Sequence, residues 1–266
     1  MKYIISNYSV VRSEDDWHIK TDKPKAVITF DDGYYDVYEN ALPILEKYNI
    51  PATVFVCTCN LDSDREFWWD CLERIVYSTS HDIVNVFGKE LKITTESEKR
   101  NALMYIHSLL KKMNDSDRND YLDVLLNKLE VSRRNTKNRS LSFEELKKLS
   151  CSKYITIGGH TVTHGSLGYE SLDKQHWEIE ESKRKIETII SKKITTFAYP
   201  FGGEEDYSEE TIKIAESAGF KKIFSTTPGF AKADYVNGRI PRLSITQEKN
   251  KEEIKTRMGL NLVLYC

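Results

Sequence analysis

Cysteine is scarce in this sequence, and the few cysteines that occur follow no regular pattern. The 266-residue chain contains five of them, an odd number with no repeated spacing, which argues against a disulfide framework. The closest pair, Cys57 and Cys59, would point both sulfurs to one face of a strand. We interpret this pair as small core residues in a reducing cytoplasm rather than as metal ligands.

Long apolar runs are also absent. No segment approaches the roughly 18 consecutive apolar residues that a transmembrane helix needs. The first residues, MKYIISNYSVVRSEDDWH, contain neither the long apolar region nor the cleavage site of a secretory leader. From these absences we expect a protein without a membrane span that resides in the cytoplasm.

The sequence has no large excess of charge of either sign. Its net charge is −2, and 39% of its residues are hydrophobic and 30% charged, a composition typical of soluble globular proteins. Because there is no global basic field, we expect no nucleic-acid partner. The basic stretch at 132–139 is interpreted as a solvated loop. No feature of the sequence indicates a particular oligomeric state.

What the sequence does contain is an alternation of β-prone runs and helical patterns. The runs are nearly continuous in apolar content, as strands buried on both faces are, and they lie at 25–30, 51–57, 154–159, 194–201, 221–227 and 238–246. Helical patterns separate them, the longest of which covers 172–190. This alternation predicts an α/β fold with a parallel sheet or barrel, and we expect a single domain over residues 1–266.

The alternation is interrupted between about residues 62 and 139. Two helical patterns lie there, and the first begins with a capping box at Thr95 and Glu98. We interpret this segment as a mostly helical insertion on one barrel loop. Trp68 and Trp69 lie where it begins, and we favour a packing role for them over a sugar-stacking platform.

Acidic and imidazole side chains follow two of the predicted strands. Asp31 and Asp32 end the run TFDDG, and His160 and His164 lie in GGHTVTH. Two imidazoles and one carboxylate would form a three-ligand metal site with open positions, and a second aspartate would accept a proton from the attacking water. Adjacent side chains of a strand face opposite sides, so the strand must break into a turn at Gly33. Each motif alone is weak, because DDG is common in turns and H-x-x-x-H occurs on helix faces.

These residues resemble the motifs of the polysaccharide deacetylase family, also called the NodB-type domain or carbohydrate esterase family four. TFDDG resembles its first motif, GGHTVTH its second, and FAYPFG at 197–202 a branch of its third. The resemblance covers about residues 25–60 and 141–246. It implies a distorted (β/α)7 barrel and metal-dependent hydrolysis of N-acetyl groups on sugars.

The resemblance also implies a role for each matching residue. Asp31 resembles the catalytic base, and Asp32, His160 and His164 resemble the metal triad. The backbone N–H of Phe201 falls where the family stabilises the oxyanion. The metal implied is a divalent cation, zinc first, with cobalt, nickel or manganese as alternatives.

Two positions depart from the family pattern. The arginine that usually begins the third motif and tethers the catalytic aspartate is Ala198 here, and Arg239 or Arg242 is the candidate replacement, with Arg242 favoured. The histidine that usually serves as general acid is Thr246 here. Protonated Asp31 is the candidate that would return a proton to the leaving amine.

Three hypotheses for function follow. The leading one is a deacetylase that acts on an N-acetylated sugar or polysaccharide, such as a surface-glycan precursor. The second is a metal-dependent amidohydrolase or esterase that acts on a small non-sugar acyl substrate. The third is a degenerate barrel that binds glycan without catalysis, and the departures at Ala198 and Thr246 motivate it.

Overall fold

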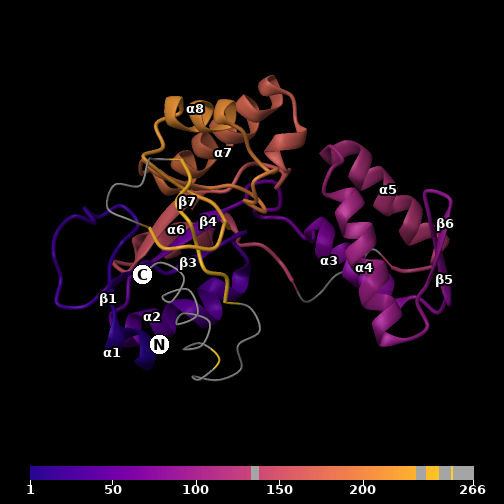
Figure 1. Cartoon of the computed structure of the whole chain (residues 1–266), viewed down its shortest axis with the longest axis horizontal. Helices are drawn as coiled ribbons and strands as arrows, with labels where there is room; N and C mark the ends of the chain where they lie inside the picture. The colour runs from indigo at the N-terminus through magenta and orange to yellow at the C-terminus, as the bar shows by residue number, and fades with distance from the viewer. Residues whose placement is uncertain (133–137, 232–237, 246–252, 254–266) are drawn as a thin grey trace. The chain divides into compact units, whose positions relative to one another are not determined.

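The structure is a computed structural model that describes residues 1–132, 138–231, 238–245 and 253 (Figure 1). The chain divides into two compact units. Residues 1–59 and 143–266 form the first, which we call the sheet unit, and residues 60–142 form the second, which we call the helical unit. The residues that resemble catalytic motifs all belong to the sheet unit.

In the part of the sheet unit that the structure describes, five parallel strands form the central sheet, in the order β3-β4-β7-β8-β9. Their bounds are Thr29–Phe30 (β3), Ala52–Val56 (β4), Ile155–Gly159 (β7), Thr196–Ala198 (β8) and Lys222–Phe224 (β9). A separate parallel pair consists of β1 (Ser9–Val10) and β2 (Lys25–Ala26). The strands lie in the sheet in the same order as in the sequence, so each new strand is added on the same side, as in a barrel. The predicted α/β fold with parallel strands is confirmed.

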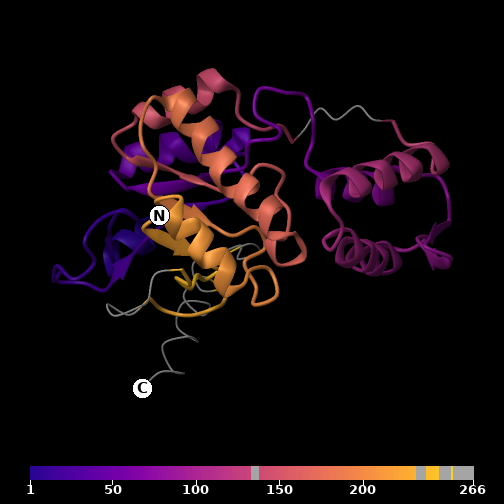
Figure 2. The ribbon, with the colours of Figure 1, turned by 90° about the horizontal axis from the view of Figure 1, so that it is seen from above.

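Helices connect these strands and cover the sheet. They are α1 (Lys2–Asn7), the π-helical turn η1 (Val37–Ala41), α2 (Leu42–Tyr48), α6 (Phe143–Cys151), the 3-10 turn η2 (Leu167–Tyr169), α7 (Leu172–Ile190) and α8 (Glu209–Ser217). Helices α6 and α7 pack against β7. Helix α7 also packs against α8, and Figure 2 shows these two helices side by side. The predicted helix at 172–190 is confirmed at both ends.

The core of the sheet unit lies on both faces of its central strands. Every residue of β4 and β7 is buried, which explains why these runs are apolar throughout. On one face, Phe55, Ala198, Phe224 and Ile240 form a cluster against which Trp17 packs. The rings of Phe55 and Phe224 lie 5.3 Å apart.

The predicted strand at 238–246 is wrong as a continuous strand. Among its described residues, only Ile240 forms a bridge, to Phe224 of β9. The next residue, Pro241, has no N–H to continue the ladder. The backbone of Arg242 then donates to the carbonyl of Thr227 at 3.2 Å. Thr246 lies outside the described residues.

Within residues 60–132 and 138–142, the helical unit contains three helices and a hairpin. Its elements are α3 (Trp68–Ser78), β5 (Ile83–Val86), β6 (Lys89–Lys92), α4 (Glu96–Leu110) and α5 (Asp115–Lys128). Helix α3 packs against both α4 and α5. The capping box predicted at Thr95 and Glu98 is present. None of the helices within the described ranges is long and apolar enough to cross a membrane.

The two tryptophans at the start of α3 have different surroundings. Trp68 is 5% exposed, and its ring lies 4.7 Å from the ring of His107 and 5.1 Å from the guanidinium of Arg118. Trp69 is half-buried and stacks on Phe67 with the ring centres 4.5 Å apart. Trp68 therefore packs in the core of the helical unit, as we favoured from the sequence.

The close contact between β4 and β7 gives a first prediction. Phe55 pairs with Gly158 in the register, and a Cβ at Gly158 would lie 2.5 Å from the Phe55 ring and 2.7 Å from Thr196 Oγ1. We expect Gly158→Ala to lower the free energy of unfolding by about 1–3 kcal/mol because of this overlap. Urea denaturation measures the change. In the double variant, Phe55→Leu should offset part of the stability that Gly158→Ala removes. If the losses of unfolding free energy from the two substitutions simply add, the steric explanation is contradicted.

Candidate active site

The two adjacent aspartates lie in a tight turn at the end of β3. The N–H of Gly33 donates to the carbonyl of Asp31 at 2.9 Å, and Asp32, between them, has a φ of 72°. This is the three-residue γ-turn with positive φ, which is rare because it strains the central residue. The carbonyl of Asp32 accepts a hydrogen bond from the N–H of Cys57 at 3.2 Å, beyond the end of β4. The turn predicted at Gly33 is confirmed.

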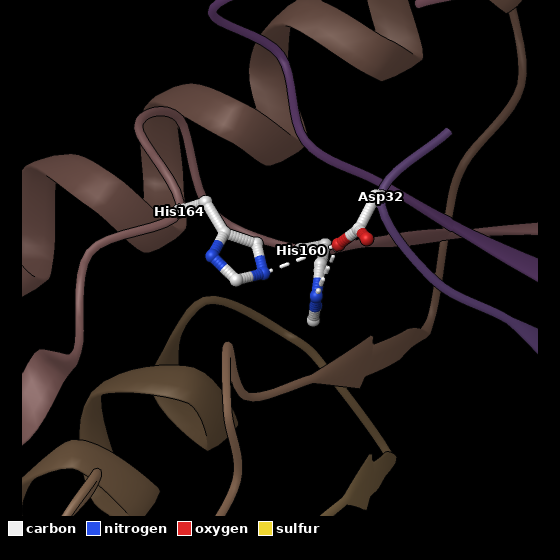
Figure 3. A group of neighbouring side chains, drawn as sticks. All are labelled: Asp32, His160 and His164. Carbon is white, nitrogen blue, oxygen red and sulfur yellow. Dashed lines mark ion pairs between the residues drawn. The ribbon is translucent and has the colours of Figure 1, made fainter. Parts of the chain in front are cut away.

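The two histidines converge on one carboxylate oxygen of Asp32 (Figure 3). Nε2 of His160 lies 3.4 Å from Asp32 Oδ1, and Nε2 of His164 lies 3.1 Å from the same oxygen. Both histidines are buried, and their rings are 4.9 Å apart. One oxygen and two nitrogens of these three residues lie within 4.8 Å of one another. Such spacing suits three ligands of a single cation.

The orientation of His160 is set by a hydrogen bond on the far side of its ring. Nδ1 lies 2.7 Å from the carbonyl of Ala198 at the end of β8. Because a carbonyl only accepts, Nδ1 carries the proton and donates it. Nε2 is then the nitrogen that faces Asp32, and it is available to a metal ion when neutral.

The charges of this group reinforce one another. Burial by itself raises the pKa of Asp32, but hydrogen bonds and charge from His160 and His164 outweigh burial and hold that pKa well below its usual range. Burial lowers the pKa of His160, but the hydrogen bond with Asp32 and the charges of Asp31 and Asp32 outweigh it and raise that pKa. An anionic oxygen beside two imidazole nitrogens is a donor set that zinc and related divalent metals accept. The residues therefore fit a divalent metal.

Asp31 is held by an arginine from the segment that follows β9. Arg242 donates from Nη1 to Asp31 Oδ1 at 2.6 Å and from Nη2 to Oδ2 at 2.8 Å, so the pair is bidentate. Its Nε donates to the carbonyl of Ser225 at 2.9 Å, which fixes the guanidinium plane. Arg239, the other candidate, pairs instead with Glu209 on the surface. The structure thus brings Arg242 to the aspartate, although Ala198 occupies the motif position.

Phe201 lies in a second γ-turn with positive φ. The N–H of Gly202 donates to the carbonyl of Pro200 at 2.6 Å, and φ of Phe201 is 60°. The ring of Phe201 lies 4.9 Å from that of His164, edge to face. Thr226, which follows β9, binds both sides of this turn, since its hydroxyl donates to the carbonyl of Phe201 and its N–H to that of Gly202. The turn is therefore fixed next to the second histidine.

Two buried carboxylates near these loops were not anticipated from the sequence. Glu178 on α7 binds the loop between the histidines. Asp206 accepts from Gly203 N–H at 2.9 Å and from Ser166 Oγ at 2.6 Å, which joins the loops that follow β8 and β7. A signal existed for Glu178, because Glu178 and Ser182 lie on the same face of α7 as the buried residues Ile179 and Ile186. A carboxylate on a buried helix face needs a partner.

The fold and site together define a class of protein. Proteins of this class have a parallel α/β sheet in which the spatial order of the strands follows the sequence order. The carboxyl ends of the strands carry an Asp-His-His group and a second aspartate. The family model for polysaccharide deacetylase matches residues 18–113 and 131–223. The chain belongs to the polysaccharide deacetylase family, and its fold is the distorted barrel of that family.

Individual relatives agree with this assignment. A Bacillus subtilis (strain 168) protein with polysaccharide deacetylase in its name, YxkH, is 24% identical over 208 residues, which are 78% of this chain and 47% of that protein. The chain therefore matches about half the length of this curated relative.

Solved structures share the fold. The deacetylase PplD of Streptococcus pyogenes, in complex with acetate, superposes with a TM-score of 0.59 and 20% identity over 96% of this chain and 81% of that one. A de-N-acetylase of Aggregatibacter actinomycetemcomitans superposes with a TM-score of 0.56 and 16% sequence identity, and the match covers 95% of this chain and 84% of that one.

The geometry of the triad gives a second prediction, on metal binding and its pH dependence. We expect metal-stripped protein to bind one zinc ion tightly in a calorimetric titration, and His164→Ala to abolish that site. Because the pKa of His160 is raised, protons compete with zinc at a higher pH than at an ordinary histidine. Affinity should fall by about tenfold or more between about pH 8 and about pH 6.

His176→Ala is the matched control for this titration. His176 is an exposed histidine of α7 whose ring nitrogen Nδ1 lies 3.2 Å from Glu180, so its loss should leave zinc affinity unchanged. A wild-type protein without a tight site, or a site that survives His164→Ala, would contradict the assignment of the triad.

Proposed function

We propose that the protein is a metal-dependent deacetylase that hydrolyses the acetamide of an N-acetylated sugar. The observation that carries this proposal is that a possible metal site lies next to an oriented carboxylate. The Asp32-His160-His164 group fits a divalent metal, and Asp31 next to it is oriented by a bidentate arginine. A metal held by the three residues would activate an acyl carbonyl and a water, and the carboxylate of Asp31 could accept a proton from that water.

In this proposal Asp32, His160 and His164 hold the metal, which is zinc or else cobalt, nickel or manganese. When bound, the metal supplies Lewis acidity to the acyl oxygen and to the water. Asp31 accepts the proton of that water as it attacks the acyl carbon. The 4.0 Å separation of Asp31 Oδ2 from His160 Nε2 supports this role, since it leaves Asp31 at the edge of the triad.

Arg242 and Phe201 complete the proposed machinery. Arg242 keeps the carboxylate of Asp31 in one orientation. The backbone N–H of Phe201 stabilises the oxyanion, and the fixed γ-turn next to His164 supports this assignment. After collapse of the tetrahedral intermediate, Asp31 returns its proton to the leaving amine, which produces acetate and a free amino sugar.

The substrate class rests on the family. Membership in the polysaccharide deacetylase family supports an N-acetylated saccharide, and the names of the relatives agree with deacetylation. We propose a glycan chain or a surface-glycan precursor as the natural substrate.

A third prediction tests the reaction itself. Zinc-loaded protein should release acetate and expose amines from N-acetylglucosamine oligomers. Asp31→Asn removes the proton acceptor, and His160→Ala removes a ligand, so each should lower turnover by about 10²–10⁴-fold. Asp36→Asn is a matched control because this exposed aspartate lies in the same segment, and it should retain full activity.

The alternatives give different outcomes in the same assay. Hydrolysis of small acyl amides or esters but not of saccharides would identify an amidohydrolase or esterase. Saccharide binding without turnover, indifferent to chelator, would identify a non-catalytic glycan-binding barrel. Wild-type turnover by Asp31→Asn would rule out the proposed mechanism.

A fourth prediction concerns the arginine. Arg242→Ala leaves Asp31 without its bidentate partner and should lower kcat by about 10–100-fold with zinc affinity nearly unchanged. Arg242→Lys keeps the charge but not the planar fork, so an intermediate kcat is expected. Arg239→Ala, which removes only a surface ion pair, should leave kcat at the wild-type value. Equal losses in Arg239→Ala and Arg242→Ala would contradict a specific role for Arg242.

A further inference from the structure

Glu178 is a completely buried carboxylate that contacts the loop between the two histidines. It lies on α7, and its side chain is 0% exposed. Oε2 accepts hydrogen bonds from the N–H groups of Val162 at 2.8 Å and Thr163 at 2.9 Å. Oε1 accepts from the hydroxyl of Thr163 at 2.6 Å. Lys174, one turn earlier on α7, brings its ammonium within 3.3 Å of Oε1.

The loop needs this acceptor because of its backbone conformation. Thr161 and His164 both have positive φ, 66° and 54°, which non-glycine residues adopt only when their surroundings enforce it. These two residues bracket Val162 and Thr163, whose amides lie outside any helix or strand and point to the carboxylate of Glu178. A buried amide without an acceptor is costly, so the carboxylate stabilises this one conformation of the loop.

The opposite side of the loop contacts the chain that follows β4 through backbone hydrogen bonds and through the thiol of Cys57, which donates to the carbonyl of Val162 at 3.0 Å. The N–H of Thr58 donates to the carbonyl of Thr161 at 3.2 Å, and that of Cys59 donates to Val162 at 2.8 Å. Lys185 of α7 in turn donates to the carbonyl of Thr58 at 2.8 Å. The loop therefore lies between the chain that follows β4 and the carboxylate of Glu178. Within the loop, the hydroxyl of Thr161 also accepts from the N–H of His164 at 3.1 Å, but Glu178 is the group that accepts from both amides between the histidines.

We propose that Glu178 is a positioning residue for the metal ligand His164. His164 is the residue directly after Thr163, and its Nε2 must reach Asp32 Oδ1, now 3.1 Å away. By holding the amides of Val162 and Thr163, Glu178 fixes the point from which the His164 side chain departs. The inference rests on the proposed function, since it concerns the ligand geometry of that same site.

The test compares zinc affinity in variants of the whole protein. Glu178→Ala removes all three acceptor contacts and should weaken zinc binding by about 10–100-fold, measured by competition with a chromophoric chelator. Glu178→Gln keeps an oxygen for the amides but loses the charge, so a loss of about 3–10-fold is expected. Thr163→Val removes the hydroxyl bond to Glu178 but keeps both amide contacts, so it should have the smallest effect.

A second readout separates positioning from general stability. Cobalt substituted for zinc should give a visible absorption spectrum that is altered in the Glu178 variants, because its ligand geometry changes. The control is Glu187→Gln on the same helix. Glu187 also accepts from a backbone N–H, that of Ile194 at 3.1 Å, and from Lys183 at 2.6 Å. This variant should lower the unfolding midpoint without changing zinc affinity or the cobalt spectrum.

The outcomes distinguish the inference from the function on which it rests. If Glu178→Gln folds and binds zinc with wild-type affinity and an unchanged cobalt spectrum, Glu178 is structural only and the inference is overturned. If Glu187→Gln weakens zinc binding as much as Glu178→Gln, the effect is general instability and the inference is also overturned. If the wild-type protein itself binds no zinc, the proposed function fails first. Should Glu178→Ala not fold, Glu178→Gln and Thr163→Val still decide the question.

Discussion

Parallel strands carry extended backbone to one edge of a sheet, and extended backbone alternates its side chains between two faces. A set of ligands at that edge can converge only if the chain turns sharply as each strand ends. In this protein the turns are made by non-glycine residues with positive φ. Asp32, His164 and Phe201 all have a positive φ. Each lies where the chain must turn to bring a side chain or a backbone N–H into the site. The site therefore depends on local strain that the surrounding hydrogen bonds hold in place.

The ionic pairing of the site follows from the same convergence. Asp31 and Asp32 are neighbours, yet each carboxylate receives a different partner, Arg242 for the first and the two histidines for the second. Two adjacent carboxylates would repel each other, so each one needs a partner of its own. The guanidinium of Arg242 also lies 5.6 Å from the ring centre of Phe55, a ring of the apolar cluster that contains Ala198. The guanidinium that binds Asp31 thus lies beside the ring of Phe55 and comes from Arg242, not from position 198.

Much of this arrangement could be predicted because it follows from local patterns. Helix α7 has the bounds that its apolar spacing indicates, and the carboxyl ends of β3 and β7 bring Asp32, His160 and His164 together as parallel strands must. The hairpin of β5 and β6 was missed because Val84 and Val86 alternate with exposed residues over only four positions. Glu178 was missed for a different reason. Its partners are backbone amides of a distant loop, and nothing in the residue types of that loop shows which amides lack a helix or strand.

The helical unit begins and ends at nearly the same point, since the N–H of Asp62 donates to the carbonyl of Leu141 at 3.1 Å. This meeting of its ends affects the order of folding. Strands β4 and β7 are direct neighbours in the sheet, with Ala52 opposite Ile155, yet about a hundred residues of chain separate them, so their pairing has a high contact order. Once the helical unit has folded, the chain that must close between the two strands shortens to about a fifth of that length, which lowers the entropic cost of closing the loop by about 1 kcal/mol. By this argument the folded helical unit favours the pairing of the two central strands of the sheet.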